Sequence, residues 1–112
     1  MTITEKETSG IVVLELSGKI MGGPDAGVLN DKLHELIDQK KTRIIVDLGK
    51  VDWMNSSGLG ILIGGLTTIR NNKGELKLAN VTERIQSLLM ITKLMTVFET
   101  YDTLDKAVAS FK

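Results

Sequence analysis

The chain has 112 residues, no cysteine, and a formal net charge of zero from 14 basic and 14 acidic side chains. This length is typical of one domain, and we expect residues 1–112 to form a single domain that buries about two thirds of its unfolded surface. The lack of cysteine excludes disulfides and thiolate metal sites, and the neutral charge gives no electrostatic footprint for nucleic acid.

The sequence also lacks the features of an exported or membrane-inserted protein. Its first residues show no basic region followed by an apolar core, so we expect no signal peptide. The longest mostly apolar run, residues 59–66, includes three glycines and is far shorter than the roughly 20 residues that span a bilayer. These features favour a cytoplasmic protein that does not insert into a membrane.

The first half of the chain predicts three strands and one helix. Residues 3–7 and 11–16 are typical of two strands around a Thr-Ser-Gly turn, and the second run is almost continuously apolar. Gly-Gly-Pro-Asp at residues 22–25 predicts a helix start, followed by an apolar stripe of Leu29, Leu33, Leu36 and Ile37. Residues 43–48 are β-branched and predict the third strand.

The second half predicts three helices and two strands. Helical spacing appears at Leu59, Leu62, Ile63, Leu66 and Ile69, and residues 71–74 end that helix. Residues 75–79 alternate as a strand does, and Asn80 with Glu83 predicts a capping box for the next helix. A short strand at residues 96–98 follows, and Asp102 is expected to cap a last helix that carries Leu104, Ala107, Val108 and Phe111.

Strands that alternate with helices imply crossover connections and a largely parallel sheet. The sequence therefore predicts an α/β fold with a mixed, mostly parallel central sheet of about five strands, four helices and an antiparallel N-terminal edge hairpin. The apolar runs at residues 11–16 and 44–46 should lie in the sheet interior, and Leu76 and Leu78 should pack inward from a strand closer to an edge.

The most informative stretch is residues 53–62, where two adjacent serines lie between a strand pattern and a helix pattern. Unpaired backbone N–H groups and the positive dipole end make such a helix start favourable for a bound or covalent phosphate. A serine at a helix start is most often only a cap, worth about 1 kcal/mol. Ser57 is nearer to the helical repeat and is the expected cap, which leaves Ser56 as the exposed hydroxyl.

The loop V-D-W-M-N-S-S-G-L-G at residues 51–60 resembles the phosphorylation loop of STAS-domain anti-sigma factor antagonists, a family of small bacterial switch proteins. The resemblance covers nearly the whole chain, including Gly18 after the second strand, Asn72-Lys73-Gly74 before a later strand, and the closing helix. It implies a single STAS domain. It also implies Ser56 as the phosphoacceptor, ahead of Ser57, because the family modifies the first serine of a D-S-S-G-L-G or D-S-T-G-L-G motif.

The resemblance implies a partner-switching binding module that regulates transcription and is not an enzyme. The unmodified form would bind an anti-sigma factor that is also a serine kinase of the histidine-kinase-like ATPase type. That kinase would phosphorylate Ser56 and release the protein, and a PP2C-type serine phosphatase would restore it. A phosphate adds about −1.5 to −2 charges, which disrupts a tight docking surface. No cofactor is implied.

Two loops are expected to form the partner-binding surface, because loops at the carboxyl ends of parallel strands gather on one side of a sheet. The expected set is Met21, Gly22, Gly23, Met54, Asn55, Ser56, Ser57 and Gly58. Met21 and Met54 serve either as core filler or as flexible apolar contacts for a partner. Trp53 is expected to pack under the loop.

Two positions depart from the family pattern. Family members commonly have an aspartate before the first serine and another three residues after the glycine matched by Gly18, where this chain has Asn55 and Met21. Both changes remove negative charge near Ser56. Asparagine keeps a similar size and hydrogen bonding, whereas methionine does not.

Other functional classes find little support. The glycines from Gly58 onward do not have nucleotide-loop spacing, and a chain with His34 as its one histidine lacks the parts of a histidine metal centre or a catalytic triad. Carboxylates of the first helix are expected on its solvated face: Asp25, Asp31, Glu35 and Asp38. The alternative function is a STAS accessory subunit of a membrane transport complex without phosphorylation control, and a serine hydrolase or nucleotide-using enzyme ranks third.

Overall fold

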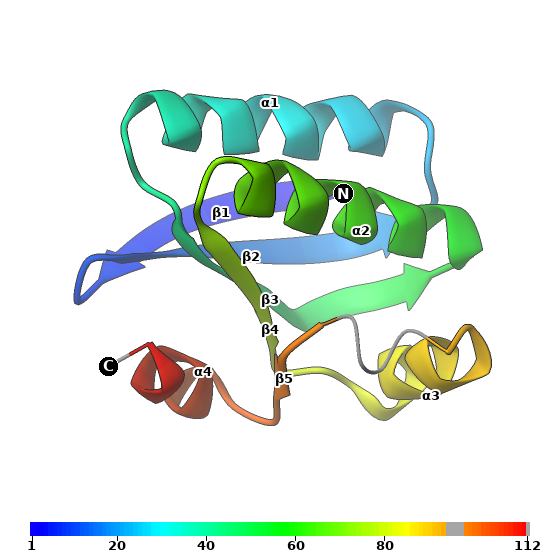
Figure 1. Ribbon diagram of the computed structural model, residues 1–112. Coiled ribbons are helices and arrows are strands. Elements are labelled where there is room, and N and C mark those ends of the chain that lie inside the picture. The colour runs from blue at the N-terminus through cyan, green and yellow to red at the C-terminus, as the bar shows by residue number, and fades with distance from the viewer. Residues whose placement is uncertain (94–97, 112) are drawn as a thin grey trace.

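The structure is a computed structural model that describes residues 1–93 and 98–111. The described chain forms a five-stranded sheet in the order β1-β2-β3-β4-β5, with helices on both sides (Figure 1). The strands are β1 (Thr2–Thr8), β2 (Ile11–Ile20), β3 (Arg43–Met54), β4 (Glu75–Ala79) and β5 (Thr100–Tyr101). The helices are α1 (Pro24–Asp38), α2 (Ser56–Asn71), α3 (Glu83–Ile91) and α4 (Leu104–Ser110). None of these described helices is long and apolar enough to cross a bilayer.

The strand pairing is the predicted mixed one. β1 and β2 are antiparallel, and the other neighbouring strands are parallel. Ser9 and Gly10 join β1 to β2 with φ values of +52° and +77°, the left-handed pair that matches the twist of a two-residue hairpin. β2 and β3 lie inside the sheet and β4 lies beside the edge strand β5, so the predicted strand placement is confirmed.

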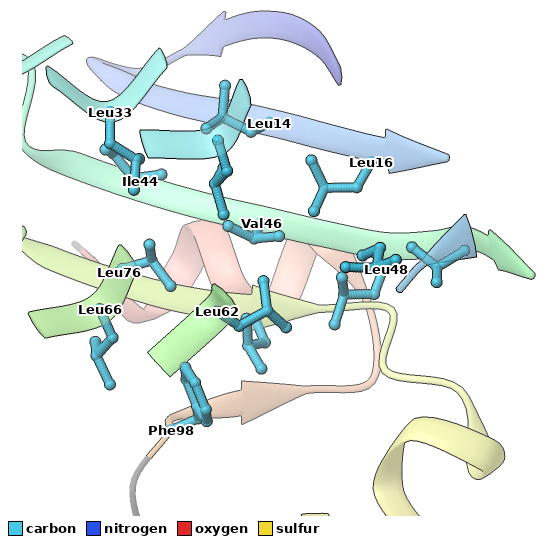
Figure 2. Packing of buried hydrophobic residues seen from close by; sticks show 14 of the residues in the cluster. Leu14, Leu16, Leu33, Ile44, Val46, Leu48, Leu62, Leu66, Leu76 and Phe98 are labelled. Carbon is cyan, nitrogen blue, oxygen red and sulfur yellow. The ribbon is translucent and has the colours of Figure 1, made fainter. Parts of the chain in front are cut away.

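The main core lies between the sheet and helices α1 and α2. Leu14 of β2 and Val46 of β3 point toward Leu33 of α1 and Leu62 of α2, and all four are fully buried (Figure 2). Gly65 of α2 allows the two helices to approach closely, since a Cβ there would lie 2.9 Å from Leu33 Cδ1. This face of the sheet therefore fixes where α2 begins relative to β3.

The opposite face of the sheet is covered in part by α4. Ile45 of β3 is fully buried there and packs with Val13, Ala79 and Ala107. Lys77 of β4 holds the end of this helix, since its Nζ lies 2.9 Å from Ser110 Oγ. β3 is therefore buried on both faces, as its continuous apolar run predicts.

Lys77 also makes an ion pair on this face. Its Nζ lies 3.1 Å from Glu99 Oε2 and 4.3 Å from the centre of the Phe111 ring. The hydrogen bond from Lys77 lowers the pKa of the Glu99 carboxyl, whose side chain is half exposed. The buried ammonium is thus paired rather than isolated, which is what burial of a charge requires.

The start of α3 differs from the prediction. Its N-cap is Thr82, whose Oγ1 accepts a hydrogen bond from Ile85 N at 3.4 Å, and not Asn80. Asn80 has a φ of +53° and donates from Nδ2 to Oδ1 of the buried Asp47 at 3.0 Å. The Asn80 side chain, which the sequence pattern assigns to the helix cap, therefore bonds to the carboxylate of Asp47 on β3.

The last helix and the last strand also differ in detail. The N-cap of α4 is Thr103, whose hydroxyl accepts from Lys106 N at 3.2 Å, and the predicted cap Asp102 lies one residue earlier. Of the strand predicted at residues 96–98, residues 96 and 97 lie outside the described residues, and Phe98 is a buried bend residue. The edge strand β5 begins two residues later, at Thr100. Phe98 is therefore apolar because it packs in the main core and not because it belongs to a strand.

β2 and β3 extend beyond their predicted ends at residues 16 and 48. Register shifts between Glu15 and Ser17, and between Gly18 and Lys19, allow the pairing to continue through polar residues. The strands consequently end side by side, with Ile20 opposite Met54.

Candidate functional site

The ends of β2 and β3 bring two segments together. Asn55 N donates a hydrogen bond to Ile20 O at 3.4 Å, directly after the last strand pair. Residues 21–23 then lead into α1, and Asn55 leads into α2, which begins with Ser56 and Ser57. We call the surface formed by residues 21–23 and 55–57 the loop face. The two segments that the topology predicts to be neighbours are therefore neighbours.

Asn55 is the N-cap of α2. Its backbone is extended, with φ −105° and ψ −176°, and its Oδ1 accepts from Gly58 N at 2.8 Å. Its Nδ2 donates to Met21 O at 3.3 Å, across the loop face. The prediction that Ser57 caps this helix is wrong, because a cap is the last residue before the helical backbone and Ser57 is already the second helical residue.

Ser56 and Ser57 both lie in the exposed first turn of α2. Ser57 faces the neighbouring segment, since a Cβ built on Gly22 would lie 3.0 Å from Ser57 Cβ. Ser57 also lines a groove of about 570 Å³ between α1 and α2, and Ser56 is not among its lining residues. The two hydroxyls therefore have different surroundings, since Ser57 lines the groove beside Gly22 and Ser56 lies outside it.

The Gly22-Gly23 pair lets residues 21–23 turn back against the start of α2. Gly22 and Gly23 have φ values of +101° and +61°, a region that glycine enters without steric cost. A side chain at Gly22 would in addition press against Ser57. Both the turn and the close approach thus depend on glycine.

The two methionines of the predicted surface differ in how exposed their side chains are. Met21 is 48% exposed on the loop face, in keeping with a contact for a partner. Met54 is only 4% exposed and belongs to the main core, so the prediction that it offers a contact to a partner is wrong. Met54 pairs in register with the buried Ile20, and both side chains face the same core.

Trp53 does not pack under the loop. Its side chain is 41% exposed, and the Arg84 guanidinium lies 5.0 Å from its ring centre. Successive strand residues point to opposite faces, so burial of Met54 turns Trp53 outward, where α3 supplies Arg84. The local sequence carries no signal for this contact, because Arg84 belongs to a distant helix.

Asp25 also belongs to this site, although the sequence pattern assigns it only to the solvated face of the first helix. Its Oδ2 accepts a hydrogen bond from Met21 N at 3.3 Å, so it anchors the loop face from the α1 side.

The first turn of α2 contains no acidic residue to neutralise its positive dipole end. The other carboxylates predicted on the surface of α1 are exposed, namely Asp31, Glu35 and Asp38, and His34 is exposed as well.

Shifted pKa values occur in ion pairs on the sheet and on α1. A hydrogen bond from Lys50 lowers the pKa of the Glu15 carboxyl, and hydrogen bonds to Glu35 and Glu5 raise the pKa of Lys32. None of these groups belongs to the loop face.

Within residues 1–93 and 98–111, no three acidic or histidine side chains gather as a metal site requires. The loop face offers exposed hydroxyls and a helix N-terminus, so a kinase acting on it would have to supply its own chemistry.

Gly58 is the position of this site that tolerates a side chain least. A Cβ at Gly58 would lie 2.1 Å from Ile20 O, and this backbone oxygen also accepts from Asn55 N. We expect Gly58→Ala to destabilise the protein by about 3 kcal/mol, since backbone must move to relieve the overlap. Thermal unfolding should show this as a decrease in Tm of roughly 10–20 °C.

Gly60→Ala is the matched control for Gly58→Ala. Gly60 lies in the same helix, and a Cβ added there would have no neighbouring atom within 4 Å, so alanine should raise stability by up to about 1 kcal/mol through helix propensity alone. Equal melting temperatures for the two variants would contradict the close packing of Gly58 against β2.

The comparisons with known proteins agree with this geometry. The STAS domain family profile matches residues 2–107. BtrV of Bordetella bronchiseptica, described as a candidate anti-sigma factor antagonist, is 25% identical over 112 residues, which cover 100% of this chain and 96% of BtrV. The anti-sigma-B factor antagonist of Bacillus subtilis is 29% identical over 99 residues, which cover 88% of this chain and 89% of the relative.

A solved structure shares the fold. The crystal structure of a candidate anti-sigma factor antagonist from Thermotoga maritima superposes with a TM-score of 0.85 at 21% identity, covering 96% of this chain and 92% of that one. At this level of identity, the structural likeness establishes the fold and not the function. The family profile covers all elements from β1 to the middle of α4, and with the matching architecture it shows that this protein belongs to the STAS domain family.

Proposed function

We propose that this protein is an anti-sigma factor antagonist whose binding to its partner is controlled by phosphorylation of Ser56. The observation that carries the proposal is the exposed Ser56 side chain at the first position of α2, on the loop face. The names of the relatives BtrV and the anti-sigma-B factor antagonist support this function for a chain that aligns with nearly their full length.

The proposed partner is an anti-sigma factor that is also a serine kinase of the histidine-kinase-like ATPase type. It binds the loop face of the unmodified protein, transfers phosphate to Ser56 and dissociates. A PP2C-type serine phosphatase restores the unmodified form. The protein itself is a binding module and acts in the cytoplasm, where ATP and the transcription machinery are available.

The electrostatics of the loop face are suited to this switch. The first turn of α2 has no acidic side chain, so its dipole end favours a phosphate on Ser56 in the free protein. The same phosphate brings about two negative charges into an interface that has formed around a neutral hydroxyl. Phosphorylation therefore stabilises the free state and destabilises the complex.

The test of this proposal starts with a pull-down by the unmodified protein. An anti-sigma factor kinase should be recovered, and addition of ATP should release it. Recovery of a permease or a transport ATPase, with no release by ATP, would instead support the alternative, a STAS accessory subunit of a membrane transport complex.

Phosphopeptide mapping then identifies the acceptor. After reaction with the recovered kinase, we expect phosphate on Ser56 in the wild type and in Ser57→Ala, and none on the loop in Ser56→Ala. The physical reason is that Ser57 lies close to Gly22 and lines the groove, while Ser56 lies outside the groove. Phosphate confined to Ser57, or to a residue such as Thr67, would contradict the assignment.

A further inference from the structure

Asn55 joins the two segments of the loop face. Its backbone N–H bonds to Ile20 O, its Nδ2 donates to Met21 O at 3.3 Å, and its Oδ1 accepts from Gly58 N at 2.8 Å. Beyond the sheet ladder, the first two are the hydrogen bonds that connect residues 20–23 with residues 55–58 in the described chain. One side chain thus fixes the start of α2 and the segment that precedes α1 at the same time.

The two side-chain contacts require an amide. One needs an acceptor for Gly58 N and the other needs a donor for Met21 O, and asparagine supplies both from adjacent atoms. Aspartate would keep the helix cap but would place a carboxylate oxygen against the Met21 carbonyl oxygen. Serine would keep a cap through its one hydroxyl oxygen and would lose the Nδ2 group that bonds to Met21 O, without adding charge.

The segment that Asn55 holds is otherwise bonded to the first turn of α1, where Asp25 N donates to Gly22 O at 3.4 Å and Ala26 N donates to Gly23 O at 3.2 Å. Gly22 and Gly23 follow Met21, and both have positive φ values. Asp25 anchors Met21 from the α1 side, through the bond to Met21 N. The Asn55 amide supplies the corresponding anchor on the α2 side, at Met21 O.

We propose that Asn55 is a positioning residue, whose amide holds residues 21–23 against the start of α2 so that a partner meets a preformed loop face. This inference rests on the proposed function for its binding consequence, and on geometry alone for its effect on the free protein. A surface that is already ordered in the free protein loses less conformational entropy on binding. Loss of the Asn55–Met21 hydrogen bond should therefore weaken binding.

The first part of the test uses the free protein and three variants. We expect Asn55→Ser and Asn55→Asp to lower the backbone ¹⁵N order parameters of Gly22 and Gly23 from about 0.85 to below about 0.6. The Gly58 amide should stay protected from hydrogen exchange and Tm should stay within a few degrees of wild type, since both substitutions keep a cap. Asn72→Ser is the matched control. It removes the hydrogen bond of 2.8 Å from Asn72 Nδ2 to Thr68 O at the other end of α2 and should leave the loop face unchanged.

The second part measures affinity for the anti-sigma factor kinase recovered in the pull-down. Asn55→Ser and Asn55→Asp should bind about tenfold more weakly than wild type, and Asn72→Ser should bind equally well. A purely structural role predicts a change in Tm with unchanged affinity at temperatures where the variants are folded. Unchanged order parameters in both variants, or wild-type affinity in both, would overturn the proposal. Failure of the proposed function itself would appear separately, as a missing phosphate on Ser56.

Discussion

Ser56→Asp should bind the proposed anti-sigma factor kinase at least about a hundredfold more weakly than the unmodified wild type does. A carboxylate that is buried in an interface without a partner costs several kcal/mol, which corresponds to this loss of affinity. In the free protein, the same carboxylate lies at the positive end of α2 and should raise stability slightly, by about 0.3–1 kcal/mol. The variant should therefore fold as well as the wild type and fail only in binding.

Two further variants make this prediction specific to charge. Ser56→Asn has the size of aspartate without its charge and should keep most of the affinity, and Ser56→Ala should bind normally but resist release by ATP. Calorimetric titration of all three against the kinase compares them directly. If Ser56→Asp binds as tightly as Ser56→Ala, the switch does not lie at this loop.

Ile45→Asp should abolish cooperative folding. Ile45 is fully buried on the central strand β3, between β2 and β4 and beneath α4. An unpaired buried carboxylate costs more than about 4 kcal/mol, a large part of the roughly 5–15 kcal/mol that stabilises a typical domain. Circular dichroism should show no cooperative thermal transition, whereas Ile45→Val should still melt cooperatively with a loss of about 1 kcal/mol.

Asp47 shows why a carboxylate fails at position 45. It lies on the same strand, two positions along, and is only 6% exposed. Its Oδ1 accepts hydrogen bonds from Gly49 N at 2.9 Å and from Asn80 Nδ2 at 3.0 Å. The side chains clustered with Ile45 are apolar, and its cross-strand neighbour Lys77 already has Glu99 and Ser110 as partners. A soluble Ile45→Asp variant that melts cooperatively would contradict the interior placement of β3.

The fold follows from local patterns to a large extent. Continuous apolar runs at residues 11–16 and 44–46 require burial on both faces, and this requirement alone places them inside a parallel sheet. The alternation of strands and helices limits the possible topologies to crossover connections. These signals are strong because each repeats over several residues of one element.

The ends of the elements were less predictable, because single residues there have competing partners. Asn80 has the spacing of a helix cap, yet its side chain bonds to Asp47, 33 residues away. β2 and β3 continue past their apolar runs because register shifts keep their backbones paired. Neither effect leaves a periodic signal in the sequence.

The candidate site divides in the same way. By itself, the sequence determined the serine-containing helix start and its position after a central strand, because helix-start chemistry is local. Only the tertiary structure decided which residue caps α2, that Met54 is buried while Trp53 is exposed, and that Asp25 and Asn55 anchor Met21 from opposite sides. Those features depend on the register between β2 and β3 and on contacts between segments far apart in the chain, and no local pattern encodes either.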